Sequence, residues 1–393
     1  MTLNTHLEPA RITRVVALMS SSRSGTSLMS SLLDFHPHIL SIPDNYLWAF
    51  SDFWDEHGGL PAADVVTAFV SHYHGLIFDA SVAQPSTGLP DWAGSDLGLT
   101  TLGENRDQAL SADPAVFRAT MLRLLPADET VTRRLFFQAM HIAYADAVGR
   151  KVAANPIILY GLHIAHPHRV RKFVDDFPNA LFLHMIRDPM QSTASQFRQF
   201  DLINTTIGAT MVGLVQSIIG SVPLVADARA RTRIVRLEDV HADGKRVMIN
   251  VCAWLGIPFN ESALRSTYNG LKFWNEKGQP QVSGISTDYI KPRHEEYTSA
   301  FDNFRIRALC ARRHFVLGYY RDSFLLRRRA IQILLAPLLL WPLRTERIEI
   351  AHALRQGKIR DVIRTYLQMR MFFLKYLLVP PPHGIPLFGE HNW

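Results

Sequence analysis

The sequence predicts an α/β protein, in which a P-loop-like parallel sheet is flanked by helices and followed by a helical C-terminal appendage. Three observations predict this class. Short apolar segments alternate with amphipathic ones between residues 14 and 255. The first of them opens a strand–loop–helix over residues 14–36, RVVALMSSSRSGTSLMSSLLDFH. The tail is different, with basic residues beside apolar runs. We therefore expect one large domain over residues 1–325 and an appendage over residues 326–393.

The segment at 14–36 has the composition of a phosphate cradle. Arg14–Met19 is an apolar strand, Ser20–Gly25 a polar loop, and Thr26–Phe35 a helix that Pro37 ends. The free N–H groups and the macrodipole at the start of such a helix favour an anion. The residues of the loop also suit an anion. Gly25 allows a close approach of the backbone, and Arg23 provides a fork-shaped cation. Hydroxyl donors come from Ser24, Thr26 and Ser27.

This loop is not the usual ATP-binding loop. A Walker A motif needs G-x-x-x-x-G-K-[ST], but the leading glycine is absent here and no lysine follows Gly25. The basic residue, Arg23, comes two positions before the glycine instead. The alternative for these few residues alone is a serine-rich turn without a ligand.

The remaining elements follow in order. We expect strands at Ile39–Ile42, Ile157–Tyr160, Ala180–Ile186 and Ile234–Leu237, and helices within 46–78, 113–150 and 206–228, at Pro167–Phe177, from Pro189 onward, and at Lys245–Leu255 with Gly256 as its cap. Residues 84–107 lack periodicity and predict a long loop. Strands that alternate with helices indicate a parallel sheet covered on both faces.

Composition narrows the class of protein. The 393 residues are 47% hydrophobic and 20% charged, which is typical of a globular chain with a sizeable core. The net charge of +7 suits an anionic cofactor, an anionic substrate or a membrane surface, but the charges look too spread out to predict nucleic-acid binding. Cys252 and Cys310 stand in apolar surroundings without metal spacing and predict reduced core residues.

Targeting signals are not found in the sequence. The first 14 residues have no apolar signal-peptide region, and no stretch reaches the roughly 20 apolar residues of a spanning helix. We therefore expect a cytoplasmic protein without a signal anchor.

A second phosphate-binding feature lies in HMIRDPMQSTASQF. Arg187 ends a strand beside the start of a helix, where a guanidinium is placed for bidentate phosphate binding. The alternative is that Arg187 pairs with Asp188 or caps a helix.

Together these segments resemble the PAPS-dependent sulfotransferases (PAPS is 3′-phosphoadenosine 5′-phosphosulfate), in particular bacterial enzymes related to tyrosylprotein and carbohydrate sulfotransferases. The order R-S-G-T-S after a strand resembles the family's 5′-phosphosulfate loop. The resemblance implies that Arg187 and Ser195, eight residues apart as in the family, hold the 3′-phosphate. It covers roughly residues 14–300.

Two further segments carry the resemblance. RLEDVHADGKRVMINVCAWLGIPF is similar to the family's strand, acidic pair and helix, and we interpret it as structural, with Leu255, Ile257 and Phe259 in the core. STDYIKP resembles a segment of tyrosylprotein sulfotransferases, which implies that Ser286 and Lys291 reach the cofactor.

The chemistry that the resemblance implies is transfer of a sulfuryl group from PAPS to a hydroxyl or amine, without a metal. Arg23 and the loop amides would neutralise charge on the leaving phosphate. For the general base, the family's glutamate corresponds to Asp44, and a lysine common in related sequences corresponds to His163. The alternative to a catalytic role for Asp44 is that it is a turn residue. The histidines at 163, 166 and 168 do not have the spacing of a metal site.

The acceptor is left open, because the aromatic residues within 46–78 allow a lipid, an aryl group, a glycan or a peptide. Two other functions also stay open: a nucleotide kinase or NTPase, which the missing Walker lysine disfavours, and a non-catalytic scaffold that keeps the fold.

The composition of the appendage predicts a separate role for it. Arg327–Arg329 precede the apolar run Ala330–Leu343, and a second run covers Met371–Val379. Basic residues beside short apolar helices suit a peripheral contact with the inner face of a membrane. The alternative is a pair of core or oligomer helices.

Overall fold

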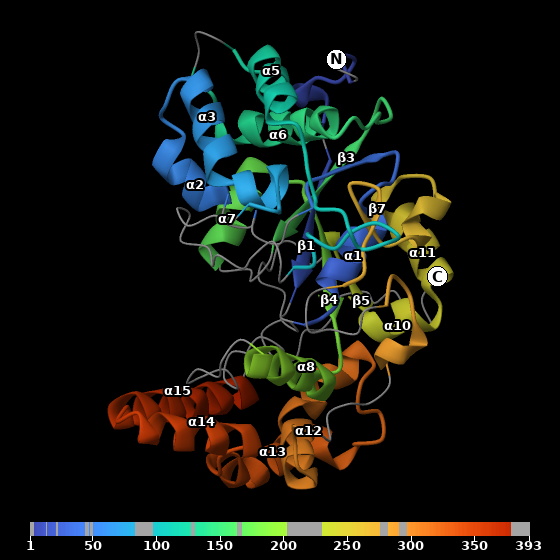
Figure 1. Ribbon diagram of the computed structural model, residues 1–393. Helices are drawn as coiled ribbons and strands as arrows, with labels where there is room; N and C mark the ends of the chain where they lie inside the picture. Colours follow the sequence, from blue (N-terminus) through green and yellow to red (C-terminus); the bar gives the residue numbers. More distant parts are fainter. Residues whose placement is uncertain are drawn as a thin grey trace. The chain divides into compact units, whose positions relative to one another are not determined.

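The computed structural model describes residues 4–12, 14–20, 23–43, 47, 50–82, 97–126, 130–162, 167–202, 230–275, 282–290 and 297–378. Within them the chain forms two compact units (Figure 1). The first comprises Met1–Met19, Thr26–His184 and Asp239–Thr287, and the second comprises Ser20–Gly25, Met185–Glu238 and Asp288–Trp393. The predicted domain boundary at 325/326 falls inside the second unit and stays a prediction.

A five-stranded sheet has the order β2-β3-β1-β4-β5. Its strands are β1 (Val15–Ser20), β2 (Ile39–Ser41), β3 (Ile157–Leu162), β4 (Leu181–Ile186) and β5 (Thr232–Arg236). Both β1 and β2 pair with β3 in parallel, with Val15 opposite Ile158 and Ile39 opposite Ile157. The predicted α/β class with a parallel sheet is thereby confirmed. Because the order reverses between β1 and β4, the segments that follow these two strands are where such folds bind ligands.

The helices of the first unit follow the predicted segments. They are α1 (Thr26–Leu33), α2 (Phe50–His57), α3 (Ala62–His72), the π-helical turn η3 (His74–Phe78), α5 (Pro114–Leu124), α6 (Arg133–Ala147), α7 (Pro167–Asp176) and α11 (Gly244–Leu255), with short turns η1 (Pro9–Arg11) and η5 (Glu261–Leu264). A small hairpin, β6 (Thr267–Tyr268) and β7 (Leu271–Lys272), follows α11. Gly256 caps α11 with φ +71°, as predicted.

Aromatic side chains fill the core of the first unit. Phe50, Phe53, Phe69, Tyr73 and Phe78 are all buried. They stack on aromatic rings from α5 and α6: Phe50 on Phe136 and Phe69 on Phe117. These aromatic residues, described within 46–78, therefore build the core, and they give no reason to prefer one acceptor class over another.

The second unit carries the remaining elements. They are α8 (Pro189–Leu202), β5, α12 (Ala300–His314), η8 (Phe315–Leu317), η9 (Leu325–Arg327), α13 (Arg329–Leu335), η10 (Ala336–Leu340), α14 (Arg344–Arg355) and α15 (Ile359–Leu378). Two short helices, α10 (Leu237–Ala242) and η6 (Thr287–Ile290), lie at the boundaries of the units. The core of this unit runs from Ile186 and Ile234 in the sheet, through Leu309 of α12, to Met369 and Phe373 of α15.

Other predictions for the core have mixed outcomes. Cys252 and Cys310 are free and buried, as expected. Leu255 and Ile257 are buried too, whereas Phe259 is partly exposed. The helices predicted within 206–228 lie outside the described residues, as does most of the predicted loop at 84–107. Among the helices that the structure describes, none is long and apolar enough to cross a membrane.

Candidate functional site

The loop between β1 and α1 has a constrained backbone. Arg23 and Gly25 both have positive φ, +60° and +89°. A β-carbon on Gly25 would lie 2.4 Å from Cδ1 of Leu237, the first residue of α10. Position 25 therefore needs glycine both for its conformation and for the space that Leu237 leaves. Arg23 has a side chain, so its positive φ is strained. Backbone strain of this kind concentrates at binding sites.

This loop and the first residue of α1 contain buried hydroxyl groups. Ser24 Oγ and Thr26 Oγ1 are inaccessible to solvent and have no hydrogen-bond partner among the described residues. Leaving a buried donor unsatisfied costs roughly 1–3 kcal/mol, so such groups are uncommon unless a ligand completes them. Together with the positive charge of Arg23, these donors fit a phosphate or sulfate group.

Two arginines of the second unit meet near the ends of β1 and β4. Arg23 Nε donates to Ser195 Oγ on α8 at 3.3 Å. Arg187 directly follows β4, and burial lowers the pKa of its guanidinium, while Glu238 raises it and the charge of Arg23 lowers it further. The two cations are thus close enough to repel one another. A bound anion would relieve both the burial and the repulsion.

Arg187 has acidic and carbonyl neighbours. Asp188 Oδ1 caps α8 by accepting from the N–H groups of Met190 (2.9 Å) and Gln191 (3.0 Å), and the charge of Asp188 also raises the pKa of Arg187. The described hydrogen bond of Arg187 is a long one, from Nη2 to the carbonyl oxygen of Tyr289 at 3.4 Å. The alternative in which Arg187 pairs with Asp188 stays open, because the charge of Asp188 is among those that raise the pKa of Arg187.

Glu238 is a partly buried carboxylate beside Arg187 that the sequence pattern predicted only as a structural residue. Its Oε1 accepts from the Asp188 N–H at 2.9 Å and its Oε2 from the Tyr319 hydroxyl at 2.7 Å. Burial raises the pKa of Glu238, and these two hydrogen bonds and Arg187 lower it. The acidic pair after β5 signalled Glu238, but nothing in the sequence pointed to Tyr319.

The other predicted site residues belong to the first unit or lie outside the described residues. The carbonyl oxygen of Ser27 accepts from the Tyr268 hydroxyl at 3.3 Å, which ties the start of α1 to the β6–β7 hairpin. The N–H of Ser286 donates to His241 Nδ1 at 3.1 Å. Asp44, His163 and Lys291 fall in segments that the structure does not describe.

The described site combines two cationic side chains with the carboxylate of Glu238. In the part of the chain that the structure describes, no group of three or more His, Cys, Asp or Glu side chains is arranged to hold a metal ion. The cations of the described site are Arg23 and Arg187.

Solved structures similar to this chain include three sulfotransferases. The sulfotransferase domain of the Synechococcus PCC 7002 olefin synthase is 16% identical, with a TM-score of 0.41, covering 79% of this chain and 97% of that one. The sulfotransferase domain of the curacin biosynthetic pathway is 12% identical, with a TM-score of 0.40, covering 71% and 86%. Sulfotransferase STF9 from Mycobacterium avium is 15% identical, with a TM-score of 0.33, covering 64% and 66%. No curated protein matches the chain.

A comparison of the sequence with models of protein families identifies the family. The model of the sulfotransferase family matches residues 16–261, which include the loop at 23–27, Arg187, Ser195 and Glu238 and make up more than half of the chain. The resemblance predicted from the R-S-G-T-S loop and the Arg187 segment is thereby confirmed, and the chain belongs to the sulfotransferase family.

Proposed function

We propose that this protein transfers a sulfuryl group from PAPS to a hydroxyl or amine of its acceptor. The observation that carries the proposal is the pair of neighbouring cations, Arg23 and Arg187, with Ser195 beside Arg23. PAPS carries two separate phosphate groups, so a binding site needs cations for both. A kinase or NTPase loop would instead have a lysine after its glycine, and Thr26 stands there.

The residues divide between the two ends of the nucleotide. Arg187 and Ser195 would hold the 3′-phosphate, and the loop at 23–27 would hold the 5′-phosphosulfate, with Ser286 and Lys291 contacting the nucleotide. When bound, PAPS supplies an activated sulfuryl group, whose leaving group is a phosphate. Arg23 and the loop N–H groups would stabilise the negative charge that grows on that phosphate, as cations do in phosphoryl transfer. Asp44 and His163 are the proposed residues for removing the acceptor proton and for assisting the leaving group.

Calorimetry with product nucleotides tests the donor. The wild-type protein should bind adenosine 3′,5′-bisphosphate more tightly than 5′-AMP or ATP, because only the bisphosphate has a 3′-phosphate. Arg187→Ala should remove most of the preference over 5′-AMP, since a charge-assisted hydrogen bond contributes roughly 1.5–3 kcal/mol. Arg171→Ala, an exposed arginine on α7, is the matched control.

Three results would each count against this proposal. Equal binding of the bisphosphate and 5′-AMP would remove the assigned role of Arg187. Tighter binding of ATP would favour the kinase or NTPase alternative. Binding of the bisphosphate without any sulfate transfer from labelled PAPS to fractionated lysate would favour a scaffold that has kept the fold.

A further inference from the structure

The positive charge of this chain is concentrated in the appendage. Residues 326–393 contain eleven Lys and Arg and four Asp and Glu, a net +7 that equals the net charge of the whole chain. Residues 1–325 are therefore neutral overall, and the expectation of a spread-out charge is wrong. Two of the four acidic side chains, Glu346 and Glu349, are buried, which leaves the exposed surface of the appendage still more basic.

Apolar side chains form a stripe along α15. Ile359, Ile363, Leu367, Met371 and Leu374 are each between 40% and 66% exposed. Their spacing of four, four, four and three residues puts them on one side of the helix. On the neighbouring side of the helix, Met369, Phe373 and Leu377 belong to the core of the unit, and Val362 is also buried. Helix α15 thus has one apolar side for the core and another that is exposed.

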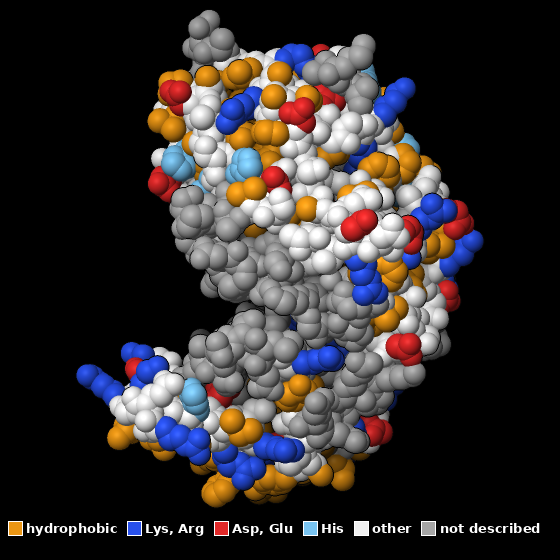
Figure 2. Space-filling model, in the orientation of Figure 1, with side chains coloured by type: hydrophobic (Ala, Val, Ile, Leu, Met, Phe, Trp, Pro, Cys, Tyr) orange, Lys and Arg blue, Asp and Glu red, His pale blue; other side chains and the backbone are white. Residues whose placement is uncertain are grey.

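A second group of exposed apolar side chains precedes α14. Leu325, Ile333, Leu334, Leu340 and Trp341 are between 52% and 73% exposed, and the three arginines Arg327–Arg329 lie within the same stretch. Figure 2 shows hydrophobic side chains gathered along the outer edge of this part of the molecule, with Lys and Arg side chains next to them. Exposed apolar groups on this scale mark an interaction surface.

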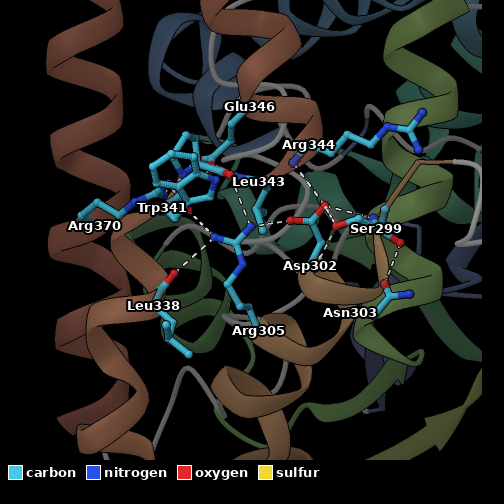
Figure 3. Close-up of polar contacts among 12 residues, drawn as sticks. Ser299, Asp302, Asn303, Arg305, Leu338, Trp341, Leu343, Arg344, Glu346 and Arg370 are labelled. Atoms are coloured by element: carbon cyan, nitrogen blue, oxygen red, sulfur yellow. Dashed lines mark hydrogen bonds and ion pairs between the residues drawn. The ribbon is translucent and has the colours of Figure 1, made fainter.

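These helices are anchored to the second unit, so the exposed groups are not a core that failed to pack. The buried Arg305 of α12 donates to the carbonyl oxygens of Leu338 and Pro342, each at 3.3 Å, and also binds the Trp341 carbonyl and the Asp302 carboxylate (Figure 3). Asp302 in turn accepts from the Arg344 N–H at 3.2 Å. Glu346 and Arg370 form a two-pronged buried ion pair at 2.8 and 2.9 Å between α14 and α15.

We propose that the outer face of η9, α13, η10, α14 and α15 docks on a bilayer that contains anionic phospholipids. Arginine beside leucine, isoleucine and tryptophan is the composition of interfacial helices, whose apolar side chains enter the acyl boundary while the basic ones contact the headgroups. The negatively charged cytoplasmic leaflet complements the +7 charge. A symmetric dimer through this face would instead bring two such basic surfaces together, which like-charge repulsion opposes. This inference does not depend on the proposed sulfotransferase activity.

Co-sedimentation of the full chain with sucrose-loaded vesicles tests the proposal. Binding is expected to phosphatidylcholine vesicles that contain phosphatidylserine, and to weaken at high salt. Arg328→Ser with Arg329→Ser should lower the partition coefficient about 30-fold, at about 1 kcal/mol for each basic residue. Leu334→Ser with Trp341→Ser should lower it at least about tenfold, because buried apolar groups contribute comparable free energies. The matched controls, Arg118→Ser with Arg171→Ser and Leu60→Ser with Leu122→Ser, change exposed residues of the first unit and should not change partitioning.

A fluorescent probe gives a reading that does not depend on these paired variants. Cys252 and Cys310 are fully buried, so NBD attached through Leu334→Cys reports on that position. Its emission should shift to the blue on addition of anionic vesicles, whereas the same probe at Leu122→Cys should not respond. Failure to bind anionic vesicles, equal binding by all variants, or a silent probe at 334 would overturn the proposal. A dimer in sedimentation equilibrium that Leu334→Ser with Trp341→Ser dissociates would replace it with self-association.

Discussion

The hydroxyl group of Tyr319 donates a hydrogen bond of 2.7 Å to Oε2 of Glu238, 81 residues earlier in the chain. The other carboxylate oxygen accepts from the Asp188 N–H. Both oxygens of Glu238 thus accept hydrogen bonds from groups other than Arg187. The negative charge of Glu238 still stabilises the charged form of Arg187. Glu238 thus raises the pKa of Arg187 through its charge, while its two oxygens accept hydrogen bonds from Tyr319 and Asp188.

Removal of the Tyr319 hydroxyl should therefore weaken nucleotide binding. In Tyr319→Phe, one oxygen of the partly buried Glu238 loses its donor and competes with the ligand for Arg187. We expect the affinity for adenosine 3′,5′-bisphosphate to fall about tenfold, equivalent to about 1.4 kcal/mol, and the free energy of unfolding to fall by about 1–3 kcal/mol. Tyr160→Phe, which removes a buried hydroxyl from the Leu47 carbonyl in the first unit, should lower only stability. Unchanged bisphosphate affinity in Tyr319→Phe would show that Glu238 does not turn towards Arg187.

Substitution of Gly25 separates conformational strain from steric conflict. Gly25→Ala should lose nucleotide binding and stability together, because the new methyl group meets Leu237 and the backbone is left-handed. Gly149 also has positive φ, +68°, but nothing lies within 4 Å of the position that a methyl group would take there, so Gly149→Ala should cost only the conformational term of about 1–2 kcal/mol. Gly59→Ala has neither problem and should be neutral or slightly stabilising. Thermal unfolding and calorimetry on the three variants measure both effects, and a bisphosphate-binding Gly25→Ala protein would contradict the loop assignment.

The strands and the phosphate loop were predictable because local chemistry determines them. The apolar runs of β1 and β4 have polar residues at both ends, and Pro189 and Gly256 mark the adjacent helix start and helix end. Arg23 and Arg187 were predicted because Arg23 lies in the loop after β1 and Arg187 directly follows β4, and parallel sheets bind ligands at such strand ends.

What the sequence did not reveal depends on contacts between distant segments. Tyr319 is in no recognisable motif, and its contact with Glu238 exists only once α12 has packed against the sheet. The sequence alone could not show that the aromatic residues of α2 and α3 belong to the core, because their partners, Phe117 and Phe136, come from helices much later in the chain. The two apolar sides of α15 likewise needed the packed structure to separate the core side from the exposed one.

Asp34 should make the stability of the fold depend on pH. Its buried Oδ2 accepts from the Gly270 N–H (3.2 Å) and the Thr267 hydroxyl (3.3 Å), and burial raises its pKa from 3.8 to about 6. The folded state thus holds this proton more tightly than the unfolded one. The contribution of this proton to the free energy of unfolding is fully present below pH 4. It is lost as the pH rises through 6, which lowers the free energy of unfolding by about 3 kcal/mol.

The variant Asp34→Asn tests this, because asparagine keeps an acceptor oxygen but cannot ionise. Urea unfolding should give similar stabilities for the two proteins near pH 4, and a more stable variant at pH 8. The buried His141 and His184, whose pKa values burial lowers to about 4, destabilise both proteins alike at acid pH, so they cancel in the difference. A difference that does not change with pH would mean that Asp34 is not the titrating group.

The last prediction concerns Asp44 and His163, the two proposed residues for proton transfer. A general base acts on the acceptor, so Asp44→Asn should reduce turnover by about 10²–10⁴ while the affinity for the bisphosphate stays nearly unchanged. The reduction should shrink for acidic acceptors such as nitrophenols, because they need little help in losing a proton. If His163 assists the leaving group instead, His163→Ala should slow transfer to acidic and ordinary acceptors by similar factors. An opposite pattern, with acidic acceptors rescuing His163→Ala and Asp44→Asn nearly silent, would exchange the two roles. Near-wild-type turnover in both variants would mean that the acceptor binds elsewhere on the chain.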